Sequence, residues 1–172
     1  MFLFLSIYVF GVLGFAYHFY KLPAQERTLG RGVELLLLYQ IVFSLGLTSI
    51  MSFFGLTFMA QYVADYTNWP ASPFEQQLAN VNLAFGTLGI MSIWYRGLFW
   101  MATIIGFSVW ILGDGLHHYI LSITQQNLSD GNIGVPLWTD IIVPTILLVL
   151  LFLHMKLNSN RRTNERIFDE VH

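Results

Sequence analysis

Five apolar runs alternate with short polar segments along the chain, and this alternation predicts an all-α integral membrane bundle of five transmembrane helices. Each run has about 20 residues or more, which is enough to cross a hydrocarbon core of about 30 Å. The expected crossings cover residues 1–20, 33–64, 73–95, 98–123 and 136–155. They form a single domain, residues 1–155, and residues 156–172 follow as a polar tail.

The third and fourth runs have the clearest boundaries. Ser72, Pro73 and Glu75 have the spacing of a capping box with proline at the first helical position, so Glu75 has a structural role. Arg96–Gly97 separates the two runs, which predicts a central hairpin. Small or polar residues share one face of the third helix and predict a close-packing seam: Ala79, Asn82, Gly86 and Gly89.

The second run is too long for a perpendicular crossing. At 1.5 Å per residue, 33–64 would extend about 48 Å, so it must tilt or continue beyond the bilayer. Polar residues recur in it at every fourth position: Gln40, Ser44, Thr48 and Ser52. Hydrogen bonding between helices explains this stripe best, and the lining of a ligand path is the alternative.

Composition supports the membrane assignment and excludes several kinds of chemistry. Of the 172 residues, 55% are hydrophobic and 10% are charged, compared with roughly 25% charged in an ordinary soluble domain. There are no cysteines, which excludes disulfides, thiolate catalysis and sulfur-ligated metal centres. The first run has no basic residue ahead of its apolar core, so we expect a retained helix rather than a signal peptide.

The basic residues predict the orientation. With five crossings, the first loop, the turn after 73–95 and the C-terminal tail lie on one side of the membrane. These segments contain all 8 basic residues: Lys21, Arg27, Arg31, Arg96, Lys156, Arg161, Arg162 and Arg166. The positive-inside rule places this side in the cytoplasm and the N-terminus outside, in a plasma or bacterial inner membrane. Four or six crossings would divide the charges between the two sides.

Polar residues that need compensation inside a membrane gather at the outer end of the expected hairpin. Asp114 lies about 24 Å along its helix from Leu98, and His117 and His118 follow within one turn. We expect amides of the preceding helix to face them and two tryptophans to form the walls. The full candidate ligand-binding set is Asp114, His118, His117, Asn80, Asn82, Trp110 and Trp69.

Three interpretations of this cluster stay open. It can hold the bundle together through hydrogen bonds, or bind a small molecule or lipid head group, as mixed apolar and polar pockets do. It can also be a metal or proton-relay centre with Asp114 and His118 as ligands or acid/base groups. A bis-histidine haem between His18 and His154 is less favoured, because both residues lie near an interface where water solvates them. No cofactor is implied strongly, and no catalytic residue is predicted.

The segment from Trp69 to His118 resembles an uncharacterised family of small prokaryotic multi-pass membrane proteins. The shared features are a Trp-Pro-x-Ser-Pro-Phe entry at residues 69–74, a helix asparagine at Asn82, a Trp-x-Arg…Phe-Trp turn at residues 94–100, and the Asp114…His118 ending. Glu75 and Gly115 depart from the family's glutamine and alanine. A fainter likeness to DoxX-type four-helix membrane proteins implies quinone-linked redox chemistry as an alternative.

Taken together, the residues predict a non-enzymatic membrane protein that binds a small molecule or lipid in an outer-side polar pocket. It would act as a transporter or as a subunit of a membrane complex. The alternatives are a redox-linked subunit that handles quinone or metal in the same pocket, and a purely structural subunit. The expected partners are the lipid bilayer and, through small-residue helix faces, a second copy or a larger complex, but no nucleic acid.

Overall fold

The computed structural model describes residues 2–70 and 72–171, with side chains described through Ser159, and all of its secondary structure is helical. The longer elements are α1 (Phe2–Lys21), α2 (Leu29–Gln40), α3 (Thr48–Phe58), α4 (Ala60–Thr67), α5 (Phe74–Met91), α6 (Leu98–Thr124) and α8 (Val135–Val171). The short ones are the 3-10 turn η1 (Ala24–Glu26), the π-helical segment η2 (Ile41–Leu47) and α7 (Asp130–Ile133).

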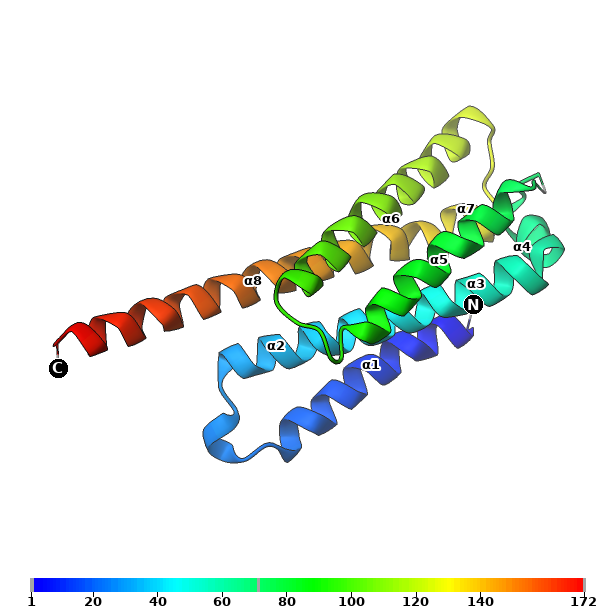
Figure 1. Cartoon of the computed structure of the whole chain (residues 1–172). Helices are drawn as coiled ribbons and strands as arrows, with labels where there is room; N and C mark the ends of the chain where they lie inside the picture. The colour runs from blue at the N-terminus through cyan, green and yellow to red at the C-terminus, as the bar shows by residue number, and fades with distance from the viewer. Residues whose placement is uncertain (1, 71, 172) are drawn as a thin grey trace.

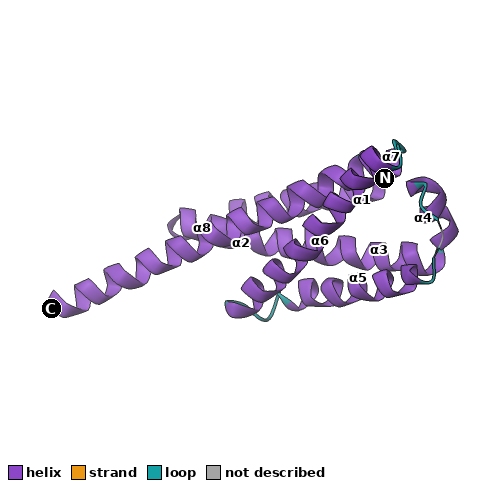
Figure 2. Cartoon of the chain, turned by 90° about the horizontal axis from the view of Figure 1, so that it is seen from above, coloured by secondary structure: helices purple, strands orange, loops and turns teal. Residues whose placement is uncertain are grey.

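The long helices run back and forth along one axis (Figures 1 and 2). Loops at one end connect α1 to α2 and α5 to α6, and the other end carries α4, α7 and the N-terminus. Four helices are long and apolar enough to cross a membrane: Leu3–Lys21, Leu29–Phe58, Leu98–Thr124 and Asp130–Ser159. The 18-residue α5, rich in amides, is not among these four.

The expected helix 33–64 departs from one regular α-helix in two places, at a π-helical segment and at a break. Its first part, α2, passes without a break into the π-helical η2 and then into α3. The helix ends at Met59, whose φ of −132° is not helical, and α4 starts a new helix. The prediction of one uninterrupted helix was therefore wrong, and the excess length is taken up by a separate helix.

The seam predicted on α5 is confirmed. The buried residues of this helix are Ala79, Asn82, Gly86 and Gly89, and the seam packs against η2 and α3. A Cβ atom on Gly89 would lie 2.5 Å from the Cα of Gly46. The two backbones therefore meet at a distance that only glycine permits.

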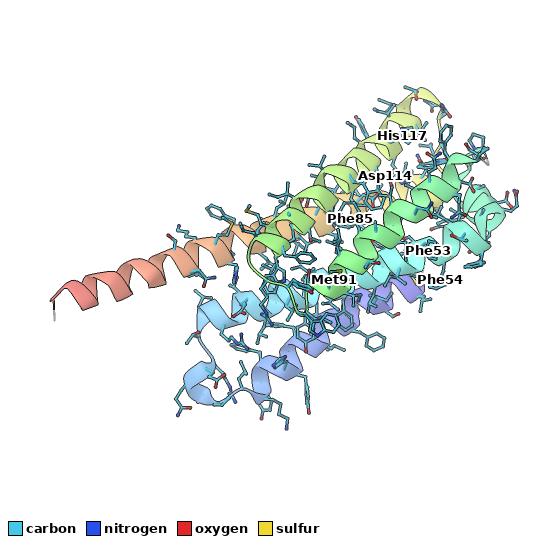
Figure 3. The ribbon with its side chains drawn as sticks, in the orientation of Figure 1. Phe53, Phe54, Phe85, Met91, Asp114 and His117 are labelled. Atoms are coloured by element: carbon cyan, nitrogen blue, oxygen red, sulfur yellow. The ribbon has the colours of Figure 1, made fainter. Side chains whose placement is uncertain are left out.

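The turn of the expected central hairpin is present, but its two helices, α5 and α6, do not pack along each other. At the turn, the Trp100 indole N–H donates to the Ser92 carbonyl oxygen at 2.9 Å, and Gly97 has a φ of 66°. Beyond it the helices separate, because α5 packs against α3 while α6 packs against α8. Phe85 of α5, labelled in Figure 3, stacks on Trp110 of α6.

The structure also tests the predicted cap at the start of α5 and the predicted end of α8. Oε1 of Glu75 accepts a hydrogen bond from the Ser72 backbone N–H at 3.2 Å, as expected for the acid of a capping box. The helix α8 does not end near residue 155 but continues to Val171 and extends beyond the bundle (Figure 1). Pro144 lies inside this helix and is buried.

Candidate functional site

Three ionisable side chains converge where α6 crosses α8. Asp114 and His118 lie one turn apart on α6, and Asp140 reaches them from α8. One possible metal-ligand atom from each residue lies within 4.8 Å of the other two. His118 is only 4% exposed, and its Nε2 lies 3.7 Å from Oδ2 of Asp140. We call these three residues the Asp–His–Asp cluster; Asp114 is labelled in Figure 3.

Gly115 allows the two helices to approach at this point. A Cβ atom there would lie 3.1 Å from the Cβ of Asp140 and 3.6 Å from Cγ1 of Ile141. A larger residue at position 115 would push α8 away from α6 at the point where the Asp140 carboxylate joins the cluster. The glycine of the Asp-Gly sequence therefore helps to assemble the cluster, in addition to packing the bundle.

Asn132, in the short helix α7, fixes the orientation of the His118 ring. Its Nδ2 donates to the carbonyl oxygens of His118 at 3.0 Å and Asn127 at 2.9 Å. Its Oδ1 accepts from Nε1 of Trp69 at 3.1 Å and lies 2.9 Å from Nδ1 of His118. Because an indole N–H can only donate, these contacts settle which end of the amide faces which partner. Nδ1 of His118 therefore donates to Asn132, and in the neutral ring the lone pair lies on Nε2.

The chain following α4 covers the cluster. Asn68 adopts a left-handed conformation with a φ of 53°, which asparagine tolerates well, and so turns the chain at Trp69. The Trp69 ring lies 4.8 Å from the His118 ring and 5.4 Å from the His117 ring, centroid to centroid. Trp69 therefore packs against both histidines of the predicted set, and its part in ligand binding stays a prediction.

The loop before α7 is held against the same segment. Nδ2 of Asn127, which is buried, donates to the carbonyl oxygens of Thr67 at 2.9 Å and Asn68 at 3.3 Å. A Cβ atom on Gly131 would lie 2.2 Å from the carbonyl oxygen of Tyr66, so only glycine permits this contact. Hydrogen bonds and a close backbone contact thus join the end of α4 to α7, which carries Asn132.

The other predicted site residues lie at the edge of the cluster or outside it. His117 is exposed and contacts Trp69 (Figure 3), while Trp110 lies one turn before Asp114 in the aromatic group with Phe85. Asn80 is exposed and accepts a hydrogen bond from Gln76, and Asn82 donates to the carbonyl oxygen of Leu78 in its own helix. The expectation that these two amides face Asp114 and His118 was wrong, because α5 packs on α3 rather than along α6.

The predicted polar stripe lies inside the bundle and leads toward the cluster. Gln40, Ser44 and Thr48 are buried, the Ser44 hydroxyl donates to Oε1 of Gln40 at 2.6 Å, and the Thr48 hydroxyl donates to the Ser44 carbonyl oxygen. The phenol of Tyr8, from α1, interacts with Thr48 and Thr139 and lies near the carboxylate of Asp140. Tyr8 thus links the stripe to the cluster. The hydrogen bonds inside the stripe join residues of one helix, whereas the prediction was hydrogen bonding between helices.

Polar groups at the opposite end of the bundle have different partners. Glu34 binds Arg31 at 2.9 Å and Arg96 at 2.7 Å, and these contacts tie the α5–α6 turn to α2. A separate hollow of about 440 Å³ near this end is lined mainly by apolar residues of α1 and α2. His18 and His154 bind Tyr39 and Asn158 respectively, so each histidine has its own partner.

The architecture defines the class of the protein: an all-helical bundle with four helices long and apolar enough to span a membrane. The chain belongs to a family of unknown function, DUF6790, whose pattern matches residues 1–160. The expected membership in an uncharacterised family is confirmed, whereas the likeness to DoxX-type proteins stays a prediction. No curated protein and no solved structure matches the chain.

Proposed function

We propose that this protein is a five-crossing membrane protein that binds a small ligand at the Asp–His–Asp cluster, at the outer side of a plasma or bacterial inner membrane. The ligand carries positive charge or several hydrogen-bond donors. The protein works as a transporter of that ligand or as a ligand-binding subunit of a larger complex. The observation that carries the proposal is the convergence of two carboxylates on one buried imidazole.

The position of α5 supports the fifth crossing. Arg96 binds Glu34, so the α5–α6 turn lies beside the first turns of α2, whereas α5 begins just after α4 at the other end of the bundle. The chain leaves α3 at one end and enters α6 at the other. If Leu29–Phe58 and Leu98–Thr124 both cross, α5 must also cross between them. Its 18 residues extend about 27 Å, close to the thickness of the hydrocarbon core.

Charge supports the orientation and the kind of ligand. The 8 basic residues of the sequence lie between the end of α1 and the first turn of α2, in the α5–α6 turn, and in the C-terminal part of α8, away from the cluster. Among the described residues, no protein group donates a hydrogen bond to the carboxylate of Asp114 or Asp140. Carboxylates in an apolar bundle need compensation, and ionisable groups within membrane helices usually serve ligand or ion binding. A cationic or donor-rich ligand provides that compensation, whereas an anionic head group would be repelled.

Native mass spectrometry of the chain extracted gently from its own membrane tests this function. We expect an additional mass on the wild-type chain that is absent from the Asp140→Asn variant. Asp65→Asn is the matched control, because it makes the same change in an exposed carboxylate of α4 at the same end of the bundle. The additional mass should persist in this control.

Two outcomes would contradict the proposal. In the first, the wild-type chain carries no additional mass, and the Asp140→Asn variant is less stable in detergent than the wild type. This result would assign the cluster to the structural alternative. The other is an additional mass that persists in both Asp140→Asn and Asp114→Asn chains, which would place the ligand elsewhere in the molecule.

A further inference from the structure

We infer that the ligand of the Asp–His–Asp cluster is a divalent transition-metal ion, bound by Nε2 of His118 and by one carboxylate oxygen each from Asp114 and Asp140. The inference rests on the proposed ligand site and names the chemical class of its occupant. Three features carry it: the state of the imidazole, the spacing of the ligand atoms, and the charge of the site.

The imidazole is already in the form that a metal requires. Asn132 uses both of its amide hydrogens on backbone carbonyl groups, and its oxygen takes the Nδ1 proton of His118. In the neutral ring Nε2 therefore carries the lone pair and lies toward the two carboxylates, which is the orientation of an imidazole that binds a metal. In metal sites, the second ring nitrogen of a histidine ligand usually donates to an oxygen acceptor in the same way.

The spacing of the ligand atoms suits a shared ion better than direct hydrogen bonding. Nε2 of His118 and Oδ2 of Asp140 lie 3.7 Å apart, too far for a hydrogen bond. Two ligands bound at about 2.1 Å in a tetrahedral arrangement are about 3.4 Å apart. All three ligand atoms lie within 4.8 Å of one another, so small rotations of the aspartate side chains bring them to one centre.

Charge suits a divalent ion better than a singly charged organic cation. Metal ligands are deprotonated, so two carboxylates and a neutral imidazole around an ion carry two negative charges, which a divalent ion cancels in full. A single ammonium group opposite the same ligands would leave one negative charge uncompensated among apolar helices, and this costs free energy. One nitrogen and two oxygen ligands, without any cysteine, suit Zn²⁺ or Mn²⁺ rather than the ions that prefer sulfur.

Three protein ligands also leave a coordination position open. Structural zinc sites bind four protein ligands, whereas sites that exchange or act on a ligand keep one position for water or substrate. Among the described residues, these three are the group of histidine and acidic side chains that can share an ion. The site is therefore suited to an ion that is exchanged rather than to one that only holds the fold together.

The test is metal binding to the full chain without a histidine tag, purified in detergent and first stripped with a chelator. Zn²⁺ and Mn²⁺ are then titrated calorimetrically, and bound metal is counted by elemental analysis. We expect one ion per chain, a higher apparent melting temperature with metal, and weaker binding at lower pH, where protons compete for the ligands. Asp140→Asn and Asp114→Asn should each weaken binding at least about 100-fold, since each removes a direct ligand.

Asp65→Asn again serves as the matched control and should bind the ion like the wild type. Helical circular dichroism and gel filtration establish that each variant is folded before titration. Binding that is equal in Asp65→Asn and Asp140→Asn chains would mean only adventitious surface ions and would overturn the inference. If neither metal binds while an organic mass disappears with Asp140→Asn, the metal is wrong and the proposed function stands. If neither an ion nor an organic mass is found, both proposals fail.

Discussion

In both the α3–α5 seam and the α6–α8 crossing, a glycine lets two helices approach, but the residues beside that glycine differ. In the seam, Gly46 and Gly89 bring two backbones into contact. In the crossing, Gly115 lets α8 approach α6 less closely, and the neighbouring residues are Asp114 and Asp140. A glycine thus sets the distance between two helices, and the residues beside it determine whether the contact becomes packing or a binding site.

We expect the largest loss of stability from a substitution of Asn132, which orients His118 at the crossing and has no counterpart in the seam. Asn132→Ala removes the partners of the Trp69 indole, the His118 ring and two backbone carbonyl groups. Unsatisfied buried groups cost about 1–3 kcal/mol each, so we expect a loss of about 2–4 kcal/mol after partial relaxation. Thermal unfolding in detergent measures it, with Asn80→Ala on the exposed face of α5 as the control. Equal stability of the two variants would contradict this role of Asn132.

A smaller effect should distinguish the seam from an ordinary helix surface. Gly89→Ala places a methyl group against the Gly46 backbone, and overpacking of this kind costs about 1–3 kcal/mol. Gly113→Ala, at a position with open space, should instead stabilise α6 by up to about 1 kcal/mol, because alanine is the better helix former. The two shifts in melting temperature should therefore have opposite signs. A stabilising Gly89→Ala would show that the backbones need not touch.

The smallest effect is expected at the end opposite the cluster. Glu34→Gln weakens the ion pairs with Arg31 and Arg96, whose side chains are 36% and 43% exposed. Partly exposed pairs contribute up to about 1 kcal/mol, and less at high salt. Melting temperatures at low and high salt should therefore differ more in the wild type than in the variant. A destabilisation as large as that of Asn132→Ala would mean that the two ends of the bundle contribute equally to stability.

The sequence predicts what each helix buries better than it predicts which helices meet. The face with Gly86 and Gly89 follows from helical periodicity alone, and Glu75 could be assigned to its cap from spacing. The partner of that face could not be predicted, because Gly46 lies in a π-helical segment whose register no periodic pattern reveals. The Arg96–Gly97 turn joins the two helices directly, and this is why α5 was expected to lie along α6.

The same limit applies to the site. Asp114 and His118 stand out because they share one turn of one helix. Asp140 joins them only because of the rotation of α8 about its own axis, which its local sequence does not determine. Asn132 lies in an Asp-Gly-Asn segment that has the composition of a loop, yet it is fully buried. Its amide donates to the backbone carbonyl oxygens of His118 and Asn127, which any residue type supplies, so the sequence carries no signal for these contacts.

Because the second long helix contains the π-helical segment η2, the fold depends on the number of residues in that segment. A π turn contains one residue more than an α turn, so it changes the phase of everything that follows by about 100°. Before it, α2 packs on α8, and from η2 onward the helix turns its glycine toward α5. Loss of one residue between Gln40 and Thr48 would restore a regular α-helix and rotate α3 away from the α5 seam. The number of residues between Gln40 and Thr48 therefore sets an angular offset between the two halves of this long helix.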